Sequence, residues 1–522
     1  MYFPKSQKAD KELKAVCYNT AYGIYGKTLP YTVLNRLEAE LKIITQKGYS
    51  LIFMIMQKAV VFSESRGYHT NPRGCVGNSL AAYFSGISNI NPLPPHYICS
   101  KCHHAEFPNN KTAYSHYDLP DAFCPVCGAE MSKSGYDLNY EFLFGADGNK
   151  IPDIDINFSD KIRDEVCEYL KTTFCDFQFM SFGHPTGFMI IPKGSDASDF
   201  LPFEKKNASI EDLKYNDFKD IIYRFDFVPV TVLTEYKYIE ELTGIPITAA
   251  KPTKEVFKLL SSQSKDILMR TGASCIPEFN KQFLQILTAK VSPTSFTEIV
   301  GLVELTHGIG AWEDNAEALI NSGIIELASI PSSPDDIMNF LINKGFNRKR
   351  AYEIADFIRL GYSVKSGYSE KWNQIVSEMN RCEIPDWFTK YCGKIQYLSP
   401  KSYAIIRSSL AVTMAWYKIY YPTEFYCAYF SVNYCPEEKK AYEIALIGKE
   451  AMKEYLEENY PESVTTDVEK YKKDICELLL IFYEALSKGI KLLPPDPLKS
   501  HKTDFLPEKG AIKFPLSLKA EI

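Results

Sequence analysis

The chain has 522 residues, of which 45% are hydrophobic and 14% aromatic, and its formal net charge at pH 7 is −6. A chain of this size and apolar content is expected to fold into about two to four domains, and its composition excludes an extensively disordered protein. The negative charge excludes a protein that is basic all over its surface. The charge weakens, without excluding, a nucleic-acid-binding function, because a basic surface can be confined to one cleft.

No segment reaches the roughly 18 consecutive apolar residues that a membrane-spanning helix needs. The first residues lack the apolar region of a secretory signal. We therefore expect a cytoplasmic protein with no membrane contact. The fourteen cysteines are too few for a disulfide scaffold, and four of them form two CxxC pairs. This spacing indicates a metal site in a reducing compartment.

The first half of the chain carries both helix and strand patterns. Apolar residues at helical spacing predict helices over 9–65, and a turn-forming stretch, NPRGCVGNS, follows at 71–79. Alternating apolar and polar residues in IPDIDINF predict a half-buried strand at 151–158. A short amphipathic helix is expected after it. Two further strands are predicted at 187–192 and 221–232.

From about residue 252 the pattern is mostly helical. Helices are predicted over 316–322, 335–345, 349–360, 402–420, 438–458 and 466–488, before a proline-rich tail. The sequence therefore predicts a mixed α/β first half followed by a helical second half.

The two CxxC pairs are Cys99-x-x-Cys102 and Cys124-x-x-Cys127, with 21 residues between them. Each CxxC turn can direct two thiolates at one ion, and two such turns complete a tetrahedral zinc site. The intervening segment is too short for a large core, so the metal would supply its folding energy. The alternative is a pair of turns with free cysteines.

Asp153 and Asp155 lie two positions apart on the predicted strand, so both carboxylates are expected on one face, roughly 6–7 Å apart along the backbone. Two like charges side by side are costly unless a cation lies between them. Such a pair suits a two-metal mechanism of phosphoryl transfer. The alternative, two carboxylates on a solvated face, is the commoner outcome for this pattern alone.

The stretch at 71–79 has features of a phosphate-binding loop. Gly74 and Gly77 allow close approach of the backbone, and Arg73 can pair bidentately with phosphate oxygens. The helix expected to begin near Leu80 would offer free N–H groups to an anion. The alternative is an ordinary capped turn.

Taken in order, these motifs resemble the PolC-type alpha subunit of bacterial DNA polymerase III, a family C polymerase. PRGCVGNS resembles the family's SRGSVGSS, NPLPPHYICSKC and CPVCG resemble its zinc insert, and PDIDINFS resembles its PDIDLNFS. The motifs GHPTGFMIIP, CIPEFNKQF, LTHGIGAW, NAEALINSG, DDIMNFLINKG, YLSPKSYA and YKIYYP follow in the family's order. The resemblance runs from about Asp10 to Phe514.

The resemblance implies a nucleotidyltransferase-type palm with a four-cysteine zinc insert, followed by mainly helical fingers. The expected parts are the first portion of the palm with the phosphate loop over 1–98, the zinc insert over 99–127, the palm with the catalytic strand over 128–245, the fingers over 246–435 and a C-terminal helical extension over 436–522.

The resemblance also implies that Asp153, Asp155 and a third carboxylate hold two catalytic Mg²⁺ ions. Asp226 is the candidate for the third, because 18 positions separate it from Gly244, which is the spacing in the family. Asp217 is the alternative. Asp226 also has a structural reading, as a polar residue on the face of a strand.

By the same resemblance, seven residues are expected to contact the incoming nucleotide or the nucleic acid. They are Arg73, Gly74, Gly77, Ser79, His184, Lys401 and Arg407. For the last two, an ordinary solvated helix start is an equally good reading. His184 can instead be a hydrogen-bonded structural histidine.

The chain departs from the family in three respects. Only 28 residues separate Asp155 from His184, so the thumb that grips the duplex is expected to be missing. Pro72, Cys75 and Asn78 replace family serines in the loop. The chain begins at the palm and ends before the family's clamp-binding tail, so neither proofreading nor clamp binding is expected.

The function expected is that of a distributive DNA polymerase core that acts on primer–template DNA and dNTPs. The alternative is a catalytically degenerate paralogue that binds nucleotide, DNA or a replication partner. A third reading is a split subunit whose thumb or clamp contacts come from another chain.

Overall fold

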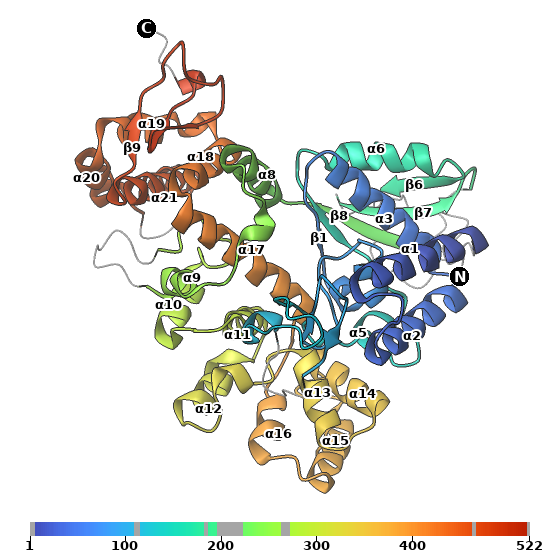
Figure 1. Ribbon diagram of the computed structural model, residues 1–522. Coiled ribbons are helices and arrows are strands. Elements are labelled where there is room, and N and C mark those ends of the chain that lie inside the picture. Colours follow the sequence, from blue (N-terminus) through green and yellow to red (C-terminus); the bar gives the residue numbers. More distant parts are fainter. Residues whose placement is uncertain are drawn as a thin grey trace. The chain divides into compact units, whose positions relative to one another are not determined.

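The computed structural model describes residues 6–108, 115–181, 186–195, 223–262, 272–461 and 466–518. Two of the residues considered above, His184 and Asp217, lie outside these ranges. The chain forms two compact units (Figure 1). The first comprises Met1–Val230 and Ser295–Ser408, and the second comprises Thr231–Thr294 and Ser409–Ile522.

The first unit begins with three helices, α1 (Gln7–Tyr25), α2 (Tyr31–Lys47) and α3 (Ser50–Ser65), as the periodicity over 9–65 predicts. The chain turns between α2 and α3 at Gly48, which has a left-handed conformation with a φ of 80°. Apolar residues on one face of α1 and α2, and all round the first half of α3, are buried in a common core. The helices therefore form because the apolar stripe of each is covered by its neighbours.

A five-stranded sheet follows, with the strand order β1-β5-β8-β7-β6. Its strands are β1 (Asn71–Pro72), β5 (Ile156–Phe158), β6 (Phe177–Ser181), β7 (Gly187–Pro192) and β8 (Tyr223–Pro229). Strands β5 and β8 are parallel, whereas the other neighbours are antiparallel.

The strand predicted at 151–158 is shorter than expected, because Asp153 and Asp155 precede β5 instead of lying in it. The expectation that both aspartates leave one face of a regular strand is therefore wrong. Strand β6 was not predicted, although the alternation in FQFMS is the signal that could have found it. The strands at 187–192 and near 223–229 confirm the other two predictions.

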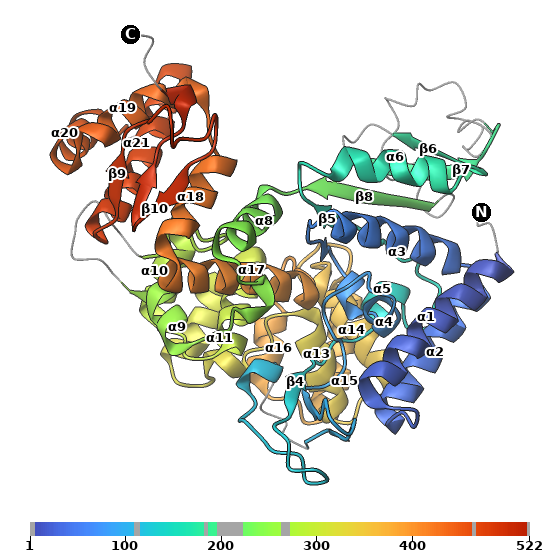
Figure 2. The same ribbon diagram turned by 45° about the horizontal axis from the view of Figure 1, so that its top comes forward.

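Helix α6 (Arg163–Thr173) packs against α3, β6 and β8 (Figures 1 and 2). Its buried residues, Val166 and Leu170, share a core with Phe158, Phe188 and Phe227 of the sheet. This aromatic layer holds β5 and β8 side by side. Strand β5, helix α6 and strand β6 occupy the stretch between Asp155 and β7, where the family resemblance predicted the loss of a thumb.

Apart from the insert that carries the paired cysteines, the remainder of the first unit is mostly helical. Its longer helices are α11 (Phe296–His307), α13 (Pro334–Asn343), α14 (Arg348–Arg359), α15 (Ser369–Arg381), α16 (Asp386–Cys392) and the beginning of α17 (Lys401–Tyr420). The shorter ones are α4 (Leu80–Phe84), α5 (Glu141–Phe144) and α12 (Glu317–Asn321). Helix α13 begins with a reciprocal capping box between Ser333 and Asp336.

The second unit contains α8 (Thr231–Thr243), α9 (Lys254–Ser261), α10 (Gln282–Val291), the rest of α17, α18 (Pro422–Val432), α19 (Lys439–Ile447), α20 (Lys449–Asn459) and α21 (Asp467–Ser487). Gly448, with a φ of 129°, divides the helix predicted at 438–458 into two. The tail that follows forms an unpredicted sheet of β9 (Lys491–Leu493), β10 (Leu506–Glu508) and β11 (Ala511–Lys513).

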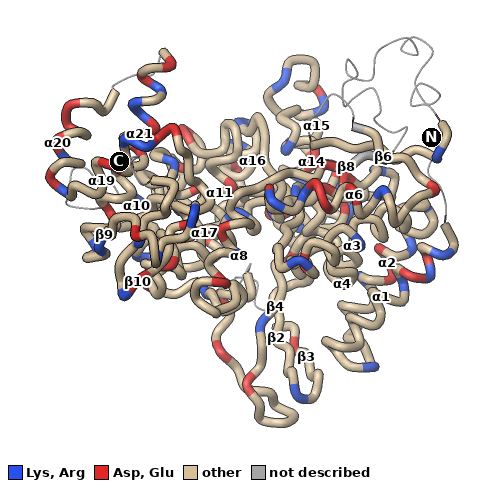
Figure 3. Tube along the Cα trace, turned by 90° about the horizontal axis from the view of Figure 1, so that it is seen from above, with Lys and Arg blue, Asp and Glu red and all other residues tan. Residues whose placement is uncertain are grey.

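The charged side chains of the second unit are mixed in sign. Figure 3 shows Lys and Arg alternating with Asp and Glu along α20 and α21. Pairs four residues apart, such as Lys453 with Glu457 and Lys473 with Glu477, account for part of this pattern. Neither helix therefore presents a purely basic surface. In the described ranges, no helix has the length and apolarity that crossing a membrane requires.

Candidate active site and metal centre

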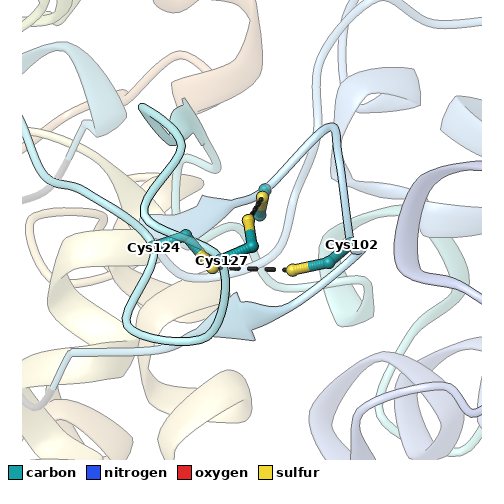
Figure 4. A group of neighbouring side chains, drawn as sticks. Cys102, Cys124 and Cys127 are labelled. Carbon is teal, nitrogen blue, oxygen red and sulfur yellow. Dashed lines mark hydrogen bonds between the residues drawn. The ribbon is translucent and has the colours of Figure 1, made fainter.

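The four cysteines of the CxxC pairs lie together. Cys99 Sγ is 3.4 Å from Cys127 Sγ, and Cys102 Sγ is 3.5 Å from Cys124 Sγ. All four sulfur atoms lie within 4.8 Å of one another, and Figure 4 shows Cys102, Cys124 and Cys127 converging from two loops. A tetrahedral site with Zn–S bonds near 2.3 Å has sulfur atoms about 3.8 Å apart. The cluster therefore has the geometry of a four-thiolate zinc site.

The insert around these cysteines has a small framework of its own. A three-stranded sheet, with the order β3-β2-β4, consists of β2 (His96–Ile98), β3 (Ala105–Glu106) and β4 (Ser132–Ser134). Among the residues that the structure describes there, its core comprises Tyr97, Leu119 and Met131 besides two buried cysteines. So few apolar side chains supply little folding energy, as expected for a segment that metal binding stabilises.

Asp155 and Asp226 are neighbours across two parallel strands. Ile156 of β5 is paired with Phe227 of β8, so the residues immediately before them lie side by side. The N–H of Asp226 donates to Oδ1 of Asp155 at 2.9 Å. The N–H of Arg73 donates to the carbonyl oxygen of Asp155, also at 2.9 Å. Asp155 is therefore the point where β8 and the loop at 71–79 meet.

The three aspartates Asp153, Asp155 and Asp226 are half-buried. Among the residues that the structure describes, only the four cysteines bring three or more His, Cys, Asp or Glu ligand atoms within 4.8 Å of one another. The fold thus places Asp155 beside Asp226, but the three carboxylates are not gathered as closely as the four thiolates are.

The beginning of the loop is shaped by its glycines in two different ways. Gly74 has a φ of 58°, a left-handed conformation that favours glycine. A Cβ atom on Gly77 would lie 2.8 Å from the Cβ of Ser402. Gly77 is therefore required for close packing against the first turn of α17. A close approach of its backbone to a ligand stays a proposal.

The N-terminus of α4 is already capped by a carboxylate of the protein. Glu40, which is fully buried on α2, accepts hydrogen bonds from Ser79 Oγ at 2.7 Å and from the N–H groups of Leu80 and Ala81 at 3.1 Å each. Arg36 pairs with the same carboxylate. The expectation that these N–H groups are free to bind a phosphate is therefore wrong.

Sequence reasoning missed Glu40, although a signal was present. Its position on α2 falls in the stripe of buried residues that includes Leu37, Leu41 and Ile44. A charged residue in an apolar stripe is buried only when it has partners. Here the partners are the helix N-terminus and Arg36.

Asn78, also fully buried, connects the loop to three other segments. Its Nδ2 donates to the carbonyl oxygen of Asn139 at 2.9 Å and to Oδ1 of Asp335 at 3.0 Å. Ser402 Oγ lies 2.7 Å from both Oδ1 of Asn78 and the carbonyl oxygen of Gly74, and its single proton is shared between them. Hydrogen bonds to residues of α13 and α17 therefore hold the loop in place.

Both interpretations of Lys401 from the sequence, a contact with the nucleotide and a solvated helix start, require an exposed side chain. In the structure Lys401 is buried at the start of α17. Its side chain is only 6% exposed and forms an ion pair with Asp336. Burial alone would lower the pKa of Lys401, but the carboxylates of Asp336 and Glu304 outweigh it and the pKa is raised. Arg407 is half-buried, with its guanidinium 4.9 Å from the ring centre of Tyr403.

Two further basic residues lie near the loop and were not singled out from the sequence. Burial raises the pKa of the Cys75 thiol, while the charges of Lys150 and Arg359 oppose that rise. Their positive charge therefore reaches the loop next to Arg73. Neither stands in a recognisable motif, so no local signal pointed to them.

Comparison with known proteins shows which family the sequence resembles. Residues 11–183 match the family described as the bacterial DNA polymerase III alpha NTPase domain. The PolC-type DNA polymerase III of Thermotoga petrophila is 32% identical over 98% of this chain and 41% of the relative. The corresponding protein of Halalkalibacterium halodurans is 31% identical over 99% of this chain and 39% of the relative.

The PolC-type enzyme of Streptococcus suis is likewise 31% identical over 98% of this chain. In each comparison the chain spans about two fifths of the length of the relative. The resemblance recognised in the sequence motifs is thus confirmed. The chain is a homologue of PolC-type DNA polymerase III along nearly all of its own length.

Proposed function

We propose that this chain is the catalytic core of a DNA-directed DNA polymerase, with a nucleotidyltransferase-type palm and helical fingers. The observation that carries the proposal is the meeting of Asp155, Asp226 and the loop of Arg73 at the N-terminal end of β5. This arrangement occurs in a chain that is homologous to PolC-type polymerases. It supports a two-metal site beside a phosphate-binding loop.

Asp153, Asp155 and Asp226 would hold two Mg²⁺ ions, for which carboxylate oxygens are the preferred protein ligands. The metals, when bound, stabilise the attacking and leaving oxygens of an in-line displacement. The 3′-oxygen of the primer forms a bond to the α-phosphorus of a dNTP, and the bond to the β-phosphate oxygen breaks. Pyrophosphate leaves, and the proton of the 3′-hydroxyl passes to solvent.

The structure supports a division of labour among the loop residues. Arg73, beside Asp155, would bind phosphate oxygens of the triphosphate, and Gly74 would let the backbone approach them. Gly77 and Ser79 would hold the shape of the loop through Ser402 and Glu40. Arg407 stays a proposed contact of the triphosphate or template.

His184 also stays a proposed contact, although it lies outside the described residues. The four-cysteine zinc site would be structural. The short stretch between β5 and β7 supports distributive synthesis, because duplex affinity depends steeply on the number of phosphate contacts. A second chain that supplies thumb or clamp contacts is compatible with this proposal.

Primer extension on a short DNA hairpin, with Mg²⁺ and all four dNTPs, tests the proposal. We expect incorporation by the wild type and its loss in an Asp153→Ala/Asp155→Ala double mutant. Asp164→Ala serves as the control, because this carboxylate has 90% of its side chain exposed. Equal incorporation by the wild type and the double mutant would rule out the assigned metal ligands.

The third ligand is tested separately by Asp226→Asn and Asp217→Asn. We expect only Asp226→Asn to abolish incorporation. The reverse result would transfer the role to Asp217.

One observation favours a second candidate function. The three carboxylates are not gathered within 4.8 Å, and Glu40 caps the helix N-terminus behind the loop. A degenerate paralogue that binds nucleotide or primer–template DNA without turnover would have these features. Saturable binding of the hairpin by a folded, zinc-loaded chain that incorporates no nucleotide would favour this candidate.

A further inference from the structure

The first unit contains a cavity of about 260 Å³ that none of the proposed metal-binding aspartates lines. Its walls are the segments that flank the zinc insert, helices α11 and α13, the stretch at 327–332 and the first turn of α17. Four titratable residues face it, namely Asp137, Glu304, Asp336 and Lys401. Apolar side chains, among them Val300 and Ile405, cover part of the remaining wall.

Glu304 is the most deeply buried of these acids, with 2% of its surface exposed. Its Oε2 accepts a hydrogen bond from Ser332 Oγ. No described residue donates to its Oε1. Buried carboxylate oxygens are normally paired, so an oxygen without a donor beside a cavity indicates that a donor from outside the chain belongs there.

Acidic groups outnumber basic ones around this cavity. Asp137, Glu304 and Asp336 line it, and Asp335, whose Oδ2 also has no described donor, lies behind them. Among the described lining residues, Lys401 is the only cation, and it is paired with Asp336. In the described lining, one ammonium group thus faces three carboxyl groups.

Protonation of some of these carboxyl groups reduces the excess of negative charge. Burial raises the pKa of Glu304, and Asp336 raises it further while Lys401 opposes the rise. Burial also raises the pKa of Asp137, against the charges of Lys401, Arg36 and Arg348. A bound cation would take the place of those protons, because it stabilises the ionised carboxylates.

We propose that the cavity binds a compact organic cation, a guanidinium or primary ammonium group, that donates hydrogen bonds to Glu304 and Asp137. An anion is disfavoured by the excess of carboxyl groups. A bare divalent metal is disfavoured because no three ligand atoms of these described residues lie within 4.8 Å of one another. The apolar wall fits the short alkyl portion that such a cation carries.

The site does not depend on the polymerase proposal, since it uses none of the residues assigned to metal binding. Its ligand has two possible sources, a free small molecule or an Arg or Lys side chain of another protein. The two share one chemistry and are separated by the experiment.

Binding of methylguanidinium and n-butylammonium to the full chain tests the proposal by ligand-observed NMR and calorimetry, with n-butanol as the neutral control. We expect saturable binding of the cations, no binding of n-butanol and affinity at least tenfold lower in Glu304→Gln and Asp137→Asn. Glu313→Gln, at an exposed position, should bind like the wild type. If a short arginine peptide binds more tightly than methylguanidinium, the source of the ligand is a protein side chain. If the two bind equally, the source is a free small molecule.

The pH dependence supplies a readout that needs no variant. Because the cation favours the ionised carboxylates, binding should release protons and strengthen as the pH rises from 5 to 8. The groups that face Glu304 and take part are Asp335, Asp336 and Lys401. The proposal is overturned by the absence of saturable binding, by equal binding of n-butanol, or by unchanged affinity in both carboxyl variants.

Discussion

Replacing Asn78 by alanine should destabilise the first unit by about 3 kcal/mol. The substitution removes three buried hydrogen bonds, two donated by Nδ2 and one accepted by Oδ1. Each buried hydrogen bond contributes about 1 kcal/mol net, so three sum to about 3 kcal/mol. Ser402 and Asp335 keep other partners, whereas the carbonyl oxygen of Asn139 loses this donor.

Urea unfolding followed by tryptophan fluorescence measures this effect. Three of the four tryptophans, Trp312, Trp372 and Trp387, lie in the first unit, so the signal reports mainly on it. A loss of about 3 kcal/mol lowers the urea concentration at the midpoint of unfolding by about 1 M, when the free energy of unfolding falls by about 3 kcal/mol per M of urea. Asn89→Ala is the matched control, because Asn89 is exposed and donates to Asn71 at 3.3 Å.

The control should change stability by less than about 0.5 kcal/mol. The reasoning fails if Asn78→Ala is as stable as Asn89→Ala, because the loop would then be held by other contacts. Asn78→Asp sharpens the test, since it sets a carboxylate against Oδ1 of Asp335. Burial raises the pKa of Asp335 to about 7, so this variant should lose more stability at pH 8 than at pH 6.

Three further predictions follow from the charges and the metal centre. Burial raises the pKa of Asp335 to about 7, above its ordinary 3.8, so its contribution to stability is complete below about pH 4 and is lost as the pH rises through 7. Asp335→Asn should flatten this pH dependence of the free energy of unfolding in urea titrations, and an unchanged pH dependence would contradict the prediction. Chelation of zinc should selectively abolish hydrogen-exchange protection in β2 and β4. Cys382→Ser is the control and should keep one zinc per chain, and protection that survives metal loss would show that the insert folds without the metal. In the second unit, Lys418→Met should cost about 1.5–3 kcal/mol, because it removes a charged hydrogen bond to the buried Glu484 carboxylate, which keeps Lys488 at 3.4 Å; thermal unfolding within 1 °C of the wild type would contradict this.

The sequence by itself determined those features that local pattern encodes. The apolar stripes of α1 and α2 predict their helices, because a 3.6-residue period leaves one face to bury. The CxxC spacing predicts the four-cysteine cluster, because each such turn directs two thiolates to one point. Through the family resemblance, the spacing of Asp226 from Gly244 also pointed to the residue whose N–H donates to the Asp155 carboxylate.

Only the tertiary structure decided which polar groups are buried and what they meet. Lys401 at the start of a helix looks solvated in the sequence, yet Asp336 from a helix 65 residues away pairs with it in the interior. Glu40 caps α4 across 40 residues, and Gly77 is required by Ser402, which lies on α17. Such partners are distant along the chain, and no local periodicity records them. The energy of a buried charge depends on the three-dimensional positions of its partners, which only the packed fold supplies.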